Sequence, residues 1–191
     1  MATIDKEKLR TVFLRKRKML SEFQADQLSV AISQRFDAFL SEKKIQNVHL
    51  FLPITKQREV NTWRILENLG AKQVEAVISR SDLNQNTLTH YLFESKDQLS
   101  VNKWGIPEPV SGKQVDVSAI DMVLVPMVVF DRNGHRIGYG KGYYDRFLSE
   151  CRPDCIKVGL SMMPPIDIIP YTDPYDIPLD YCVTPLKTYE F

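Results

Sequence analysis

Hydrophobic positions near the N-terminus repeat with helical spacing. Residues 5–20 carry one apolar stripe, formed by Leu9, Val12, Phe13 and Leu20. Beside it, three basic residues align at about 100° per residue: Lys6, Arg10 and Arg17. Ser21 and Gln24 form a capping-box pattern, and a second apolar face follows: Leu28, Ile32, Phe36 and Phe39. The pattern predicts two successive amphipathic helices.

The rest of the chain alternates between short apolar runs and amphipathic segments. Helices are predicted at residues 59–69, with Gly70 at the end, and at 142–151. Strands are predicted at residues 47–53, 74–79, 88–93, 120–130 and 156–161, with a last short one near 181–185. The run 120–130 is apolar on both faces, as is typical of a central strand, although it contains Pro126. The alternation predicts an α/β fold: one three-layer α/β/α domain over residues 1–191 with a mostly parallel or mixed central sheet.

Composition and charge exclude several classes of protein. The 191 residues are 43% hydrophobic and 26% charged, and a net charge of +1 provides no strong basic field for nucleic acid. The longest apolar run, residues 123–130, is too short to span a bilayer, and the N-terminus lacks the apolar core of a signal peptide. Three cysteines without a CxxC motif fit free thiols in a reducing, cytoplasmic setting. We expect no membrane or nucleic-acid partner; the oligomeric state is open, with a monomer favoured.

The most unusual stretch is RIGYGKGYYD at residues 136–145. It places glycines, which are costly in regular elements, at every second position: Gly138, Gly140 and Gly142. Backbone N–H groups without a Cβ can approach an anion closely, and the start of a helix adds partial positive charge. Arg136 and Lys141 add full charges, and Asp145 fits beside phosphates if it holds a magnesium ion that they also bind. The stretch predicts a polyphosphate cradle, although its spacing matches neither the P-loop nor the Rossmann fingerprint.

A glycine-rich hairpin turn with an exposed lysine is the alternative interpretation of this stretch. For a lone GxGxG motif the two interpretations would be about equally good. The charged residues and the expected strand-to-helix junction favour phosphate binding.

The longer stretch FDRNGHRIGYGKGYYDRFL closely resembles the signature of the 5-formyltetrahydrofolate cyclo-ligase family, also called methenyltetrahydrofolate synthetases. The resemblance covers most of the chain, with further motifs in the expected order: K-x-x-x-R at Lys6 and Arg10, EVNT at 59–62, WGIPEP at 104–109, VGLS at 158–161 and YDIPLDYCVT at 175–184.

The resemblance implies an activity. 5-Formyltetrahydrofolate and ATP would become 5,10-methenyltetrahydrofolate, ADP and phosphate, with magnesium. The formyl oxygen would attack the γ-phosphate, N10 would attack the resulting iminium phosphate, and phosphate would leave. This chemistry requires positioning and charge neutralisation rather than a protein nucleophile.

The resemblance also implies site residues. Nucleotide contacts are expected at Lys6, Arg10, Arg136, Gly138, Tyr139, Gly140, Lys141, Gly142, Tyr143 and Tyr144. Arg136 and Lys141 would be the catalytic charges among them. Folate contacts are expected at Leu52, Glu59, Trp104, Tyr139, Gly140, Lys141, Gly142 and Tyr143. Asp145 and Asp180 are the expected magnesium ligands, with Asp173 and Asp176 as competitors for the second position.

Several of these residues have a structural alternative. Lys6 and Arg10 could form a solvated helix face, and Glu59 could be an ordinary acid in the first turn of a helix. Leu52 could be a buried strand residue, and Trp104 a core tryptophan.

Two departures from the family pattern concern the shape of the site. Met127 stands where a glycine is usual, which should narrow the space near the loop, and the segment YTDPY before Asp176 lacks the expected acid-histidine pair. Two other functions remain open from sequence. One is another phosphate-handling enzyme on a similar fold, such as a sugar-phosphate isomerase or CoA-transferase relative. The other is a nucleotide- or RNA-binding module.

Overall fold

A seven-stranded mixed sheet forms the centre of the molecule in the computed structural model, which describes residues 5–191. The strand order is β11-β10-β9-β6-β1-β2-β3, and the five interior strands run parallel. Only the edge strands β3 and β11 pair antiparallel with their neighbours. The strands are β1 (Asn47–His49), β2 (Glu75–Asp82), β3 (Thr87–Leu92), β6 (Met122–Val125), β9 (Ile156–Leu160), β10 (Tyr181–Val183) and β11 (Thr188–Glu190).

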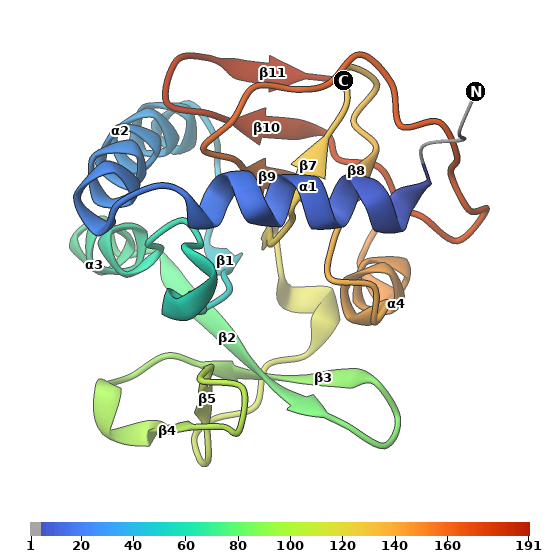
Figure 1. Ribbon diagram of the computed structural model, residues 1–191. Coiled ribbons are helices and arrows are strands. Elements are labelled where there is room, and N and C mark those ends of the chain that lie inside the picture. Colours follow the sequence, from blue (N-terminus) through green and yellow to red (C-terminus); the bar gives the residue numbers. More distant parts are fainter. Residues whose placement is uncertain (1–4) are drawn as a thin grey trace.

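Helices cover both faces of this sheet, which confirms the expected three layers (Figure 1). Helices α2 (Glu22–Ser41) and α3 (Trp63–Ala71) lie on one face, and α4 (Tyr143–Glu150) lies on the other. Strand β6 shows why both faces must be covered. Met122 and Leu124 pack into the cluster of α2 and α3, while Val123 and Val125 pack toward α4. Side chains alternate along a strand, so a strand that is apolar at every position needs a partner on each side.

Helix α1 (Lys6–Lys18) belongs to neither layer. It crosses the segments that follow β1 and β6, and packs on a small separate hairpin of β7 (Val129–Phe130) and β8 (Arg136–Ile137) (Figure 1). Phe13 of α1 joins Val128, Val129 and Ile137 in one apolar cluster. The expected capping box of α2 is confirmed, because the Ser21 side chain accepts from Gln24 N and the Gln24 side chain accepts from Ser21 N. Both N-terminal helices are therefore confirmed.

The predicted strand 120–130 is interrupted. Pro126 has no N–H to donate to a neighbouring strand, so β6 ends at Val125 and the chain turns away into the β7–β8 hairpin. The predicted strand 47–53 likewise ends early, at His49. A further antiparallel pair, β4 (Leu99–Val101) and β5 (Pro107–Pro109), and three short 3₁₀ turns were not predicted: η1 (Thr55–Gln57), η2 (Lys96–Gln98) and η3 (Val117–Ala119).

The helix predicted at 59–69 begins four residues later, at Trp63. Glu59 is therefore not in a first helical turn, and that interpretation of it is wrong. Gly70 lies inside the helix, while Gln73 beyond its end adopts the left-handed conformation (φ 58°).

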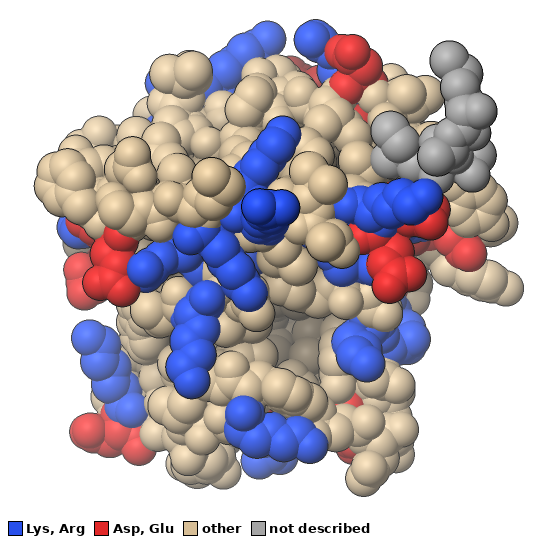
Figure 2. Space-filling model, viewed as in Figure 1, with Lys and Arg blue, Asp and Glu red and all other residues tan. Residues whose placement is uncertain are grey.

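The strand order has a switch point at the sheet centre, between β1 and β6, and the surface has a crevice near this place (Figure 2). From β1 the chain crosses through α3 to β2 on one side, whereas β6 lies beside β1 on the other side. In parallel α/β sheets, ligands bind outside the carboxyl ends of the strands at such a switch point. Two segments leave these ends. Residues 50–62 follow β1, and residues 126–142 follow β6 and include the β7–β8 hairpin and the glycine loop.

A buried pair of histidines lies between the sheet and α4. His49 Nε2 is 2.6 Å from Ser79 Oγ, which is 2.9 Å from His90 Nδ1, and Phe147 packs against both rings. Burial lowers the pKa of His90 to about 4 and holds the pKa of His49 well below its usual value. Both rings are therefore neutral in the folded protein.

The histidine pair predicts a loss of stability in acid. Unfolded histidines take up protons near pH 6.5. Between about pH 4 and 6.5 the unfolded chain therefore binds more protons, and the free energy of unfolding should fall with falling pH by about 1.4 kcal/mol per pH unit for each histidine. Urea unfolding at several pH values should show this slope in the parent. In His90→Gln the slope should be smaller by the contribution of one histidine, about 1.4 kcal/mol per pH unit. Parallel slopes for the variant and the parent would rule out this origin.

Candidate active site

The glycine loop links β8 to α4 and borders the crevice. It follows the β7–β8 hairpin, not the central strand as expected. Gly140 (φ 87°) and Gly142 (φ 69°) adopt left-handed conformations that strain other residues, whereas a Cβ on Gly138 would meet nothing within 4 Å. Gly142 is the N-cap of α4 and has no side chain with which to cap this end of the helix. The first N–H groups of α4 are consequently suited to an anion.

Helix α1 supplies a cation to this loop. Arg10 Nε donates to Gly138 O at 2.8 Å, and its guanidinium lies so close to Gly140 that a Cβ there would be 3.1 Å from Nη2. Lys141 is exposed, and its carbonyl oxygen accepts from Arg146 Nη2 at 2.6 Å. The structure thus brings Arg10 and Lys141, two of the sequence-predicted residues, to one loop.

Arg136, expected to contact phosphate, is buried and already paired. Its side chain is 5% exposed; Nη2 donates to Asp145 Oδ1 at 2.6 Å, and Nη1 donates to Ile177 O. Burial lowers the pKa of Arg136, and the charges of Asp145 and Asp176 oppose this. Arg136 therefore ties α4 to the segment around Ile177.

Two carboxylates lie on this side of the loop. Asp145 also accepts from Ile177 N at 3.3 Å, and the neighbouring Asp176 pairs with Lys6. Burial acts to raise the pKa of Asp176, but the hydrogen bond from Lys6 and the backbone of Asp173 outweigh it, so the net shift is downward. The Asp145 and Asp176 side chains keep 30% and 26% exposure.

Asp180 is placed elsewhere. It precedes β10 and accepts from Lys157 N at 2.7 Å and pairs with Lys157 Nζ at 2.9 Å, at the amino end of the parallel strands. Asp176, which the sequence left as a competitor, is the acid that the structure brings to Asp145. Within residues 5–191 no group of three or more His, Cys, Asp or Glu side chains is arranged to hold a metal ion.

Glu59 is a buried acid on the opposite side of the crevice. Its carboxylate accepts from Ile54 N at 2.6 Å and from the Tyr139 hydroxyl at 2.5 Å, and the residue is 8% exposed. Burial raises the pKa of Glu59, against the hydrogen bonds from Ile54 and Tyr139 and the charge of Arg17. Among the described residues each carboxylate oxygen has one hydrogen-bond donor, so each keeps a lone pair for a ligand.

Arg17 is a residue of this site that was not assigned from sequence. It is 8% exposed, and its Nη2 donates to the Tyr139 hydroxyl. The available signal was its alignment with Lys6 and Arg10 on the same helical stripe. Nothing in that stripe showed that Arg17, unlike its two companions, would be buried.

The remaining predicted residues differ in exposure. Leu52 is 5% exposed and belongs to the main core. Trp104 is 47% exposed between β4 and β5, so the core-tryptophan alternative is wrong. Tyr143 donates to Asp82 O at 3.2 Å. Tyr144 lies near Glu59 and Arg136, and burial raises the pKa of its phenol.

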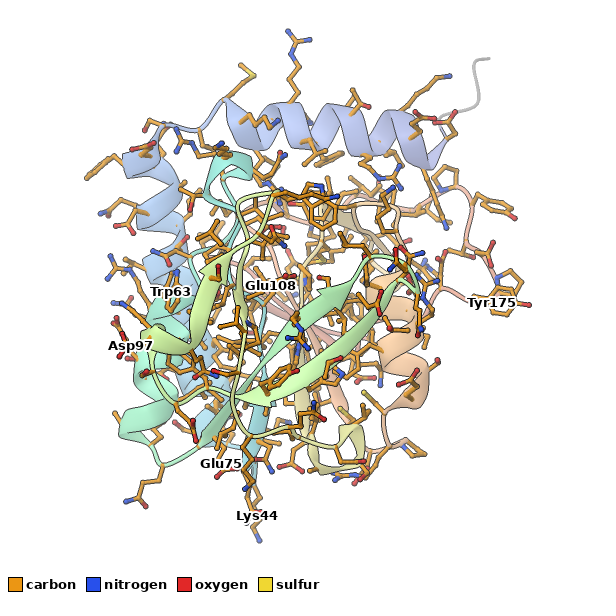
Figure 3. All side chains as sticks on the ribbon, turned by 90° about the horizontal axis from the view of Figure 1, so that it is seen from below. Lys44, Trp63, Glu75, Asp97, Glu108 and Tyr175 are labelled. Atoms are coloured by element: carbon orange, nitrogen blue, oxygen red, sulfur yellow. The ribbon has the colours of Figure 1, made fainter. Side chains whose placement is uncertain are left out.

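Neither departure from the family pattern fills the crevice. Met127 packs against Gly159, where a Cβ would be 2.7 Å from Met127 Cε, so its side chain points into the core rather than into the loop. Tyr175, in the segment YTDPY, projects away from the molecule and is 84% exposed (Figure 3).

The surface is hollowed at this place. Figure 2 shows a hollow below α1 and between η1 and α4, with Lys and Arg side chains on several sides. Glu108 of β5, which is 9% exposed, accepts from Ser81 N and Oγ and lies near the middle of the view from below (Figure 3).

Comparisons with known proteins agree on one family. The sequence profile of the 5-formyltetrahydrofolate cyclo-ligase family matches residues 2–185. A probable 5-formyltetrahydrofolate cyclo-ligase of Schizosaccharomyces pombe is 30% identical, over 97% of each chain. The 5-formyltetrahydrofolate cyclo-ligase of Mycoplasma genitalium is 29% identical, over 94% of this chain and 98% of its own.

Solved structures show the same relationship. The Aquifex aeolicus 5,10-methenyltetrahydrofolate synthetase matches with a TM-score of 0.83 and 33% identity, over 97% of this chain and 92% of that one. The Mycoplasma pneumoniae 5,10-methenyltetrahydrofolate synthetase has a TM-score of 0.77 and 28% identity, over 95% and 99%.

No helix within residues 5–191 combines the length and apolar character needed to cross a membrane. The profile match, the relatives and the shared α/β fold lead to one conclusion: the chain is an enzyme of the 5-formyltetrahydrofolate cyclo-ligase family.

Proposed function

We propose that this enzyme converts 5-formyltetrahydrofolate to 5,10-methenyltetrahydrofolate in a reaction that consumes ATP and requires magnesium. One observation carries the proposal: a buried carboxylate acceptor, Glu59, and a glycine loop with free helix N–H groups are joined through Tyr139 at one crevice. The first group suits the pterin and the second suits phosphates.

The reaction needs two displacements. The formyl oxygen attacks the γ-phosphorus of ATP and ADP leaves. N10 then attacks the activated formyl carbon, phosphate leaves with the former formyl oxygen, and N10 releases its proton. The protein's part is to align the reactants and offset charge, because neither step needs a covalent bond to a side chain.

Phosphates would lie at the glycine loop. The N–H groups at the start of α4 point toward this place, and Arg10 and Lys141 bring positive charge to it from two elements. Arg136 acts differently from the sequence-based expectation, because it holds Asp145 instead of facing the crevice. Lys6 acts through its pair with Asp176 at the edge of the same loop.

Magnesium fits Asp145 together with Asp176. Magnesium commonly takes one or two carboxylates and completes its shell with phosphate oxygens and water, so a cluster of three protein acids is not required. Both carboxylates are partly exposed and are linked through Arg136 and Ile177. When bound, the ion would offset negative charge on the transferred phosphoryl group. We assign the second position to Asp176 in place of Asp180.

The pterin would be held by Glu59. The 2-amino group of the pterin and the adjacent ring N–H are two donors side by side. The Glu59 carboxylate has two lone pairs that no group within residues 5–191 uses. Tyr143 and the exposed Trp104 are suited to the flat rings of folate, while Leu52 supports Glu59's loop from the core.

Three unpaired cysteines fit a reducing, cytoplasmic setting. We propose a monomer that acts on 5-formyltetrahydrofolate with or without a polyglutamate tail.

The reaction predicts a strict dual requirement. Purified protein mixed with 5-formyltetrahydrofolate should give the ultraviolet absorbance of the methenyl product only when ATP and a divalent metal are both present. Product formed in excess EDTA would contradict the metal role, and product formed without ATP would contradict phosphoryl activation.

The choice of Asp176 predicts a difference between two matched variants. Asp176→Asn should raise the magnesium concentration needed for half-maximal rate by roughly tenfold or more, because it removes a charged ligand. Asp180→Asn should leave this concentration within about twofold of the parent, since Asp180 is paired with Lys157 at the other end of the strands. The reverse ranking would restore Asp180 as the ligand. Melting temperatures of both variants separate a folding defect from a metal effect.

Glu59→Gln should raise the KM for folate by roughly 10- to 100-fold and leave the KM for ATP nearly unchanged. The amide replaces one accepting oxygen with a donor, which leaves a buried N–H without a partner at a cost of about 1–3 kcal/mol. Steady-state kinetics with each substrate varied in turn checks this. Glu67→Gln, an exposed acid on α3, is the matched control and should resemble the parent. Unchanged folate affinity in Glu59→Gln would place the pterin elsewhere.

A further inference from the structure

Arg17 lies at the junction of three segments that form the crevice. From α1 its Nε donates to Gln57 O at 2.8 Å, its Nη1 donates to Met127 O at 3.1 Å, and its Nη2 donates to the Tyr139 hydroxyl. These three acceptors belong to the segment after β1, the segment after β6 and the glycine loop. One planar guanidinium therefore fixes three loops relative to one another.

The direct partners of Arg17 are all neutral. Two are backbone carbonyls and one is a phenol, although the guanidinium is buried. The carboxylate that balances its charge is Glu59, on the far side of the Tyr139 hydroxyl. A buried charge is tolerated when it is paired and hydrogen-bonded, and here the pairing runs through one hydroxyl group.

The direction of this chain of hydrogen bonds is fixed. A guanidinium can only donate, so the Tyr139 oxygen must accept from Arg17. The single phenol proton is then free to go only to Glu59 Oε1, while Ile54 N donates to Oε2. Such chains polarise each bond in turn. In the protein without ligand, both Glu59 carboxylate oxygens therefore already act as hydrogen-bond acceptors.

We propose that Arg17 is a positioning residue for the folate substrate: acting through Tyr139, it orients the Glu59 carboxylate and keeps it in its accepting form. The inference rests on the proposed function, since it assumes that Glu59 receives the pterin. It assigns to Arg17 no contact with the substrate.

The charged or titratable groups that face Glu59 are Arg17, Tyr139 and Tyr144. Burial raises the pKa of Glu59, and Arg17 is the one cation among these groups that opposes the rise. Removing its charge should raise the pKa of Glu59 further. More of the carboxyl would then carry a proton at a given pH, and an acceptor for the pterin would be lost.

The test compares Arg17→Met with Arg15→Met, an exposed arginine on the same helix. In Arg17→Met the KM for folate should rise roughly tenfold at pH 7.5, as for other lost charged hydrogen bonds. As the pH falls to 6, the KM for folate should also rise more steeply in Arg17→Met than in the parent. The KM for ATP and kcat should stay within about threefold of the parent. Arg15→Met should match the parent throughout.

Three further variants separate charge from packing. Arg17→Lys keeps the charge but not the three-way geometry, so its folate KM should rise while its pH profile stays like the parent's. Tyr139→Phe leaves the other two hydrogen bonds of Arg17 in place but removes its link to Glu59. The folate KM of this variant should therefore rise more steeply than the parent's as the pH falls. In Arg17→Met combined with Glu59→Gln, the additional pH dependence should disappear and the folate KM should exceed that of Glu59→Gln by less than about twofold.

A second readout needs no substrate. Carbon-13 NMR titration of the Glu59 carboxyl, assigned by comparison with Glu59→Gln, should give a higher pKa in Arg17→Met than in the parent or Arg15→Met. An unchanged Glu59 pKa overturns the coupling. Equal rises in the folate and ATP KM values, without steeper pH dependence, overturn the positioning role and make Arg17 a general brace. A parent protein that fails to bind folate overturns the proposed function and the substrate role of Arg17 together, whereas the titration still shows the coupling within the protein.

Discussion

Two charges buried at the carboxyl ends of the sheet, on Arg17 and Glu59, constrain the surrounding structure. Each would be costly without partners, and their shared partner is the Tyr139 hydroxyl. Satisfying both requires helix α1, the loop after β1, the turn after β6 and the glycine loop to meet at one place. These hydrogen bonds therefore hold in place the segments that border the crevice. A second pair, the buried Arg136 with the partly exposed Asp145, fixes the far side of the glycine loop to the segment around Ile177.

These two networks divide the proposed site into halves with different physical character. The Glu59 half is buried and offers acceptors in fixed positions, which suits a flat heterocycle that presents donors. The half around Arg10, Lys141 and the start of α4 is more open and positively charged, which suits phosphates. Residues 139–143 belong to both halves. In the proposed reaction, this short loop would bind both substrates and so hold the formyl oxygen next to the γ-phosphate.

Much of this arrangement could be predicted from sequence, because it depends on local patterns. The apolar runs gave the sheet and its layers, the capping box gave the start of α2, and the glycine spacing gave the loop. The strand 120–130 was predicted too long because its periodicity continues past Pro126, where the backbone cannot. The acid Glu59 was assigned to a helix because its neighbours have helical spacing, whereas its side chain accepts from Ile54 and Tyr139 instead.

The differences between the expected and the observed surroundings of site residues have a common physical origin: they depend on contacts between residues far apart in sequence. Asp176 and Asp180 are four positions apart and chemically identical, and only the fold shows that one meets Lys6 while the other meets Lys157. Arg17 shares its helical stripe with two other basic residues, and only the packing of α1 over the crevice buries it. Arg136 was placed against phosphate because it adjoins the glycine loop, whereas its side chain turns inward to Asp145.

The most direct measurement is a crystal structure of the protein with 5-formyltetrahydrofolate and a non-hydrolysable ATP analogue. In this complex we expect the pterin 2-amino group and the adjacent ring N–H to lie within hydrogen-bond distance of the Glu59 carboxylate. We also expect the γ-phosphate to lie against the start of α4, between Arg10 and Lys141, with the formyl oxygen facing its phosphorus. A pterin bound away from Glu59, or phosphates bound away from the glycine loop, would contradict the account.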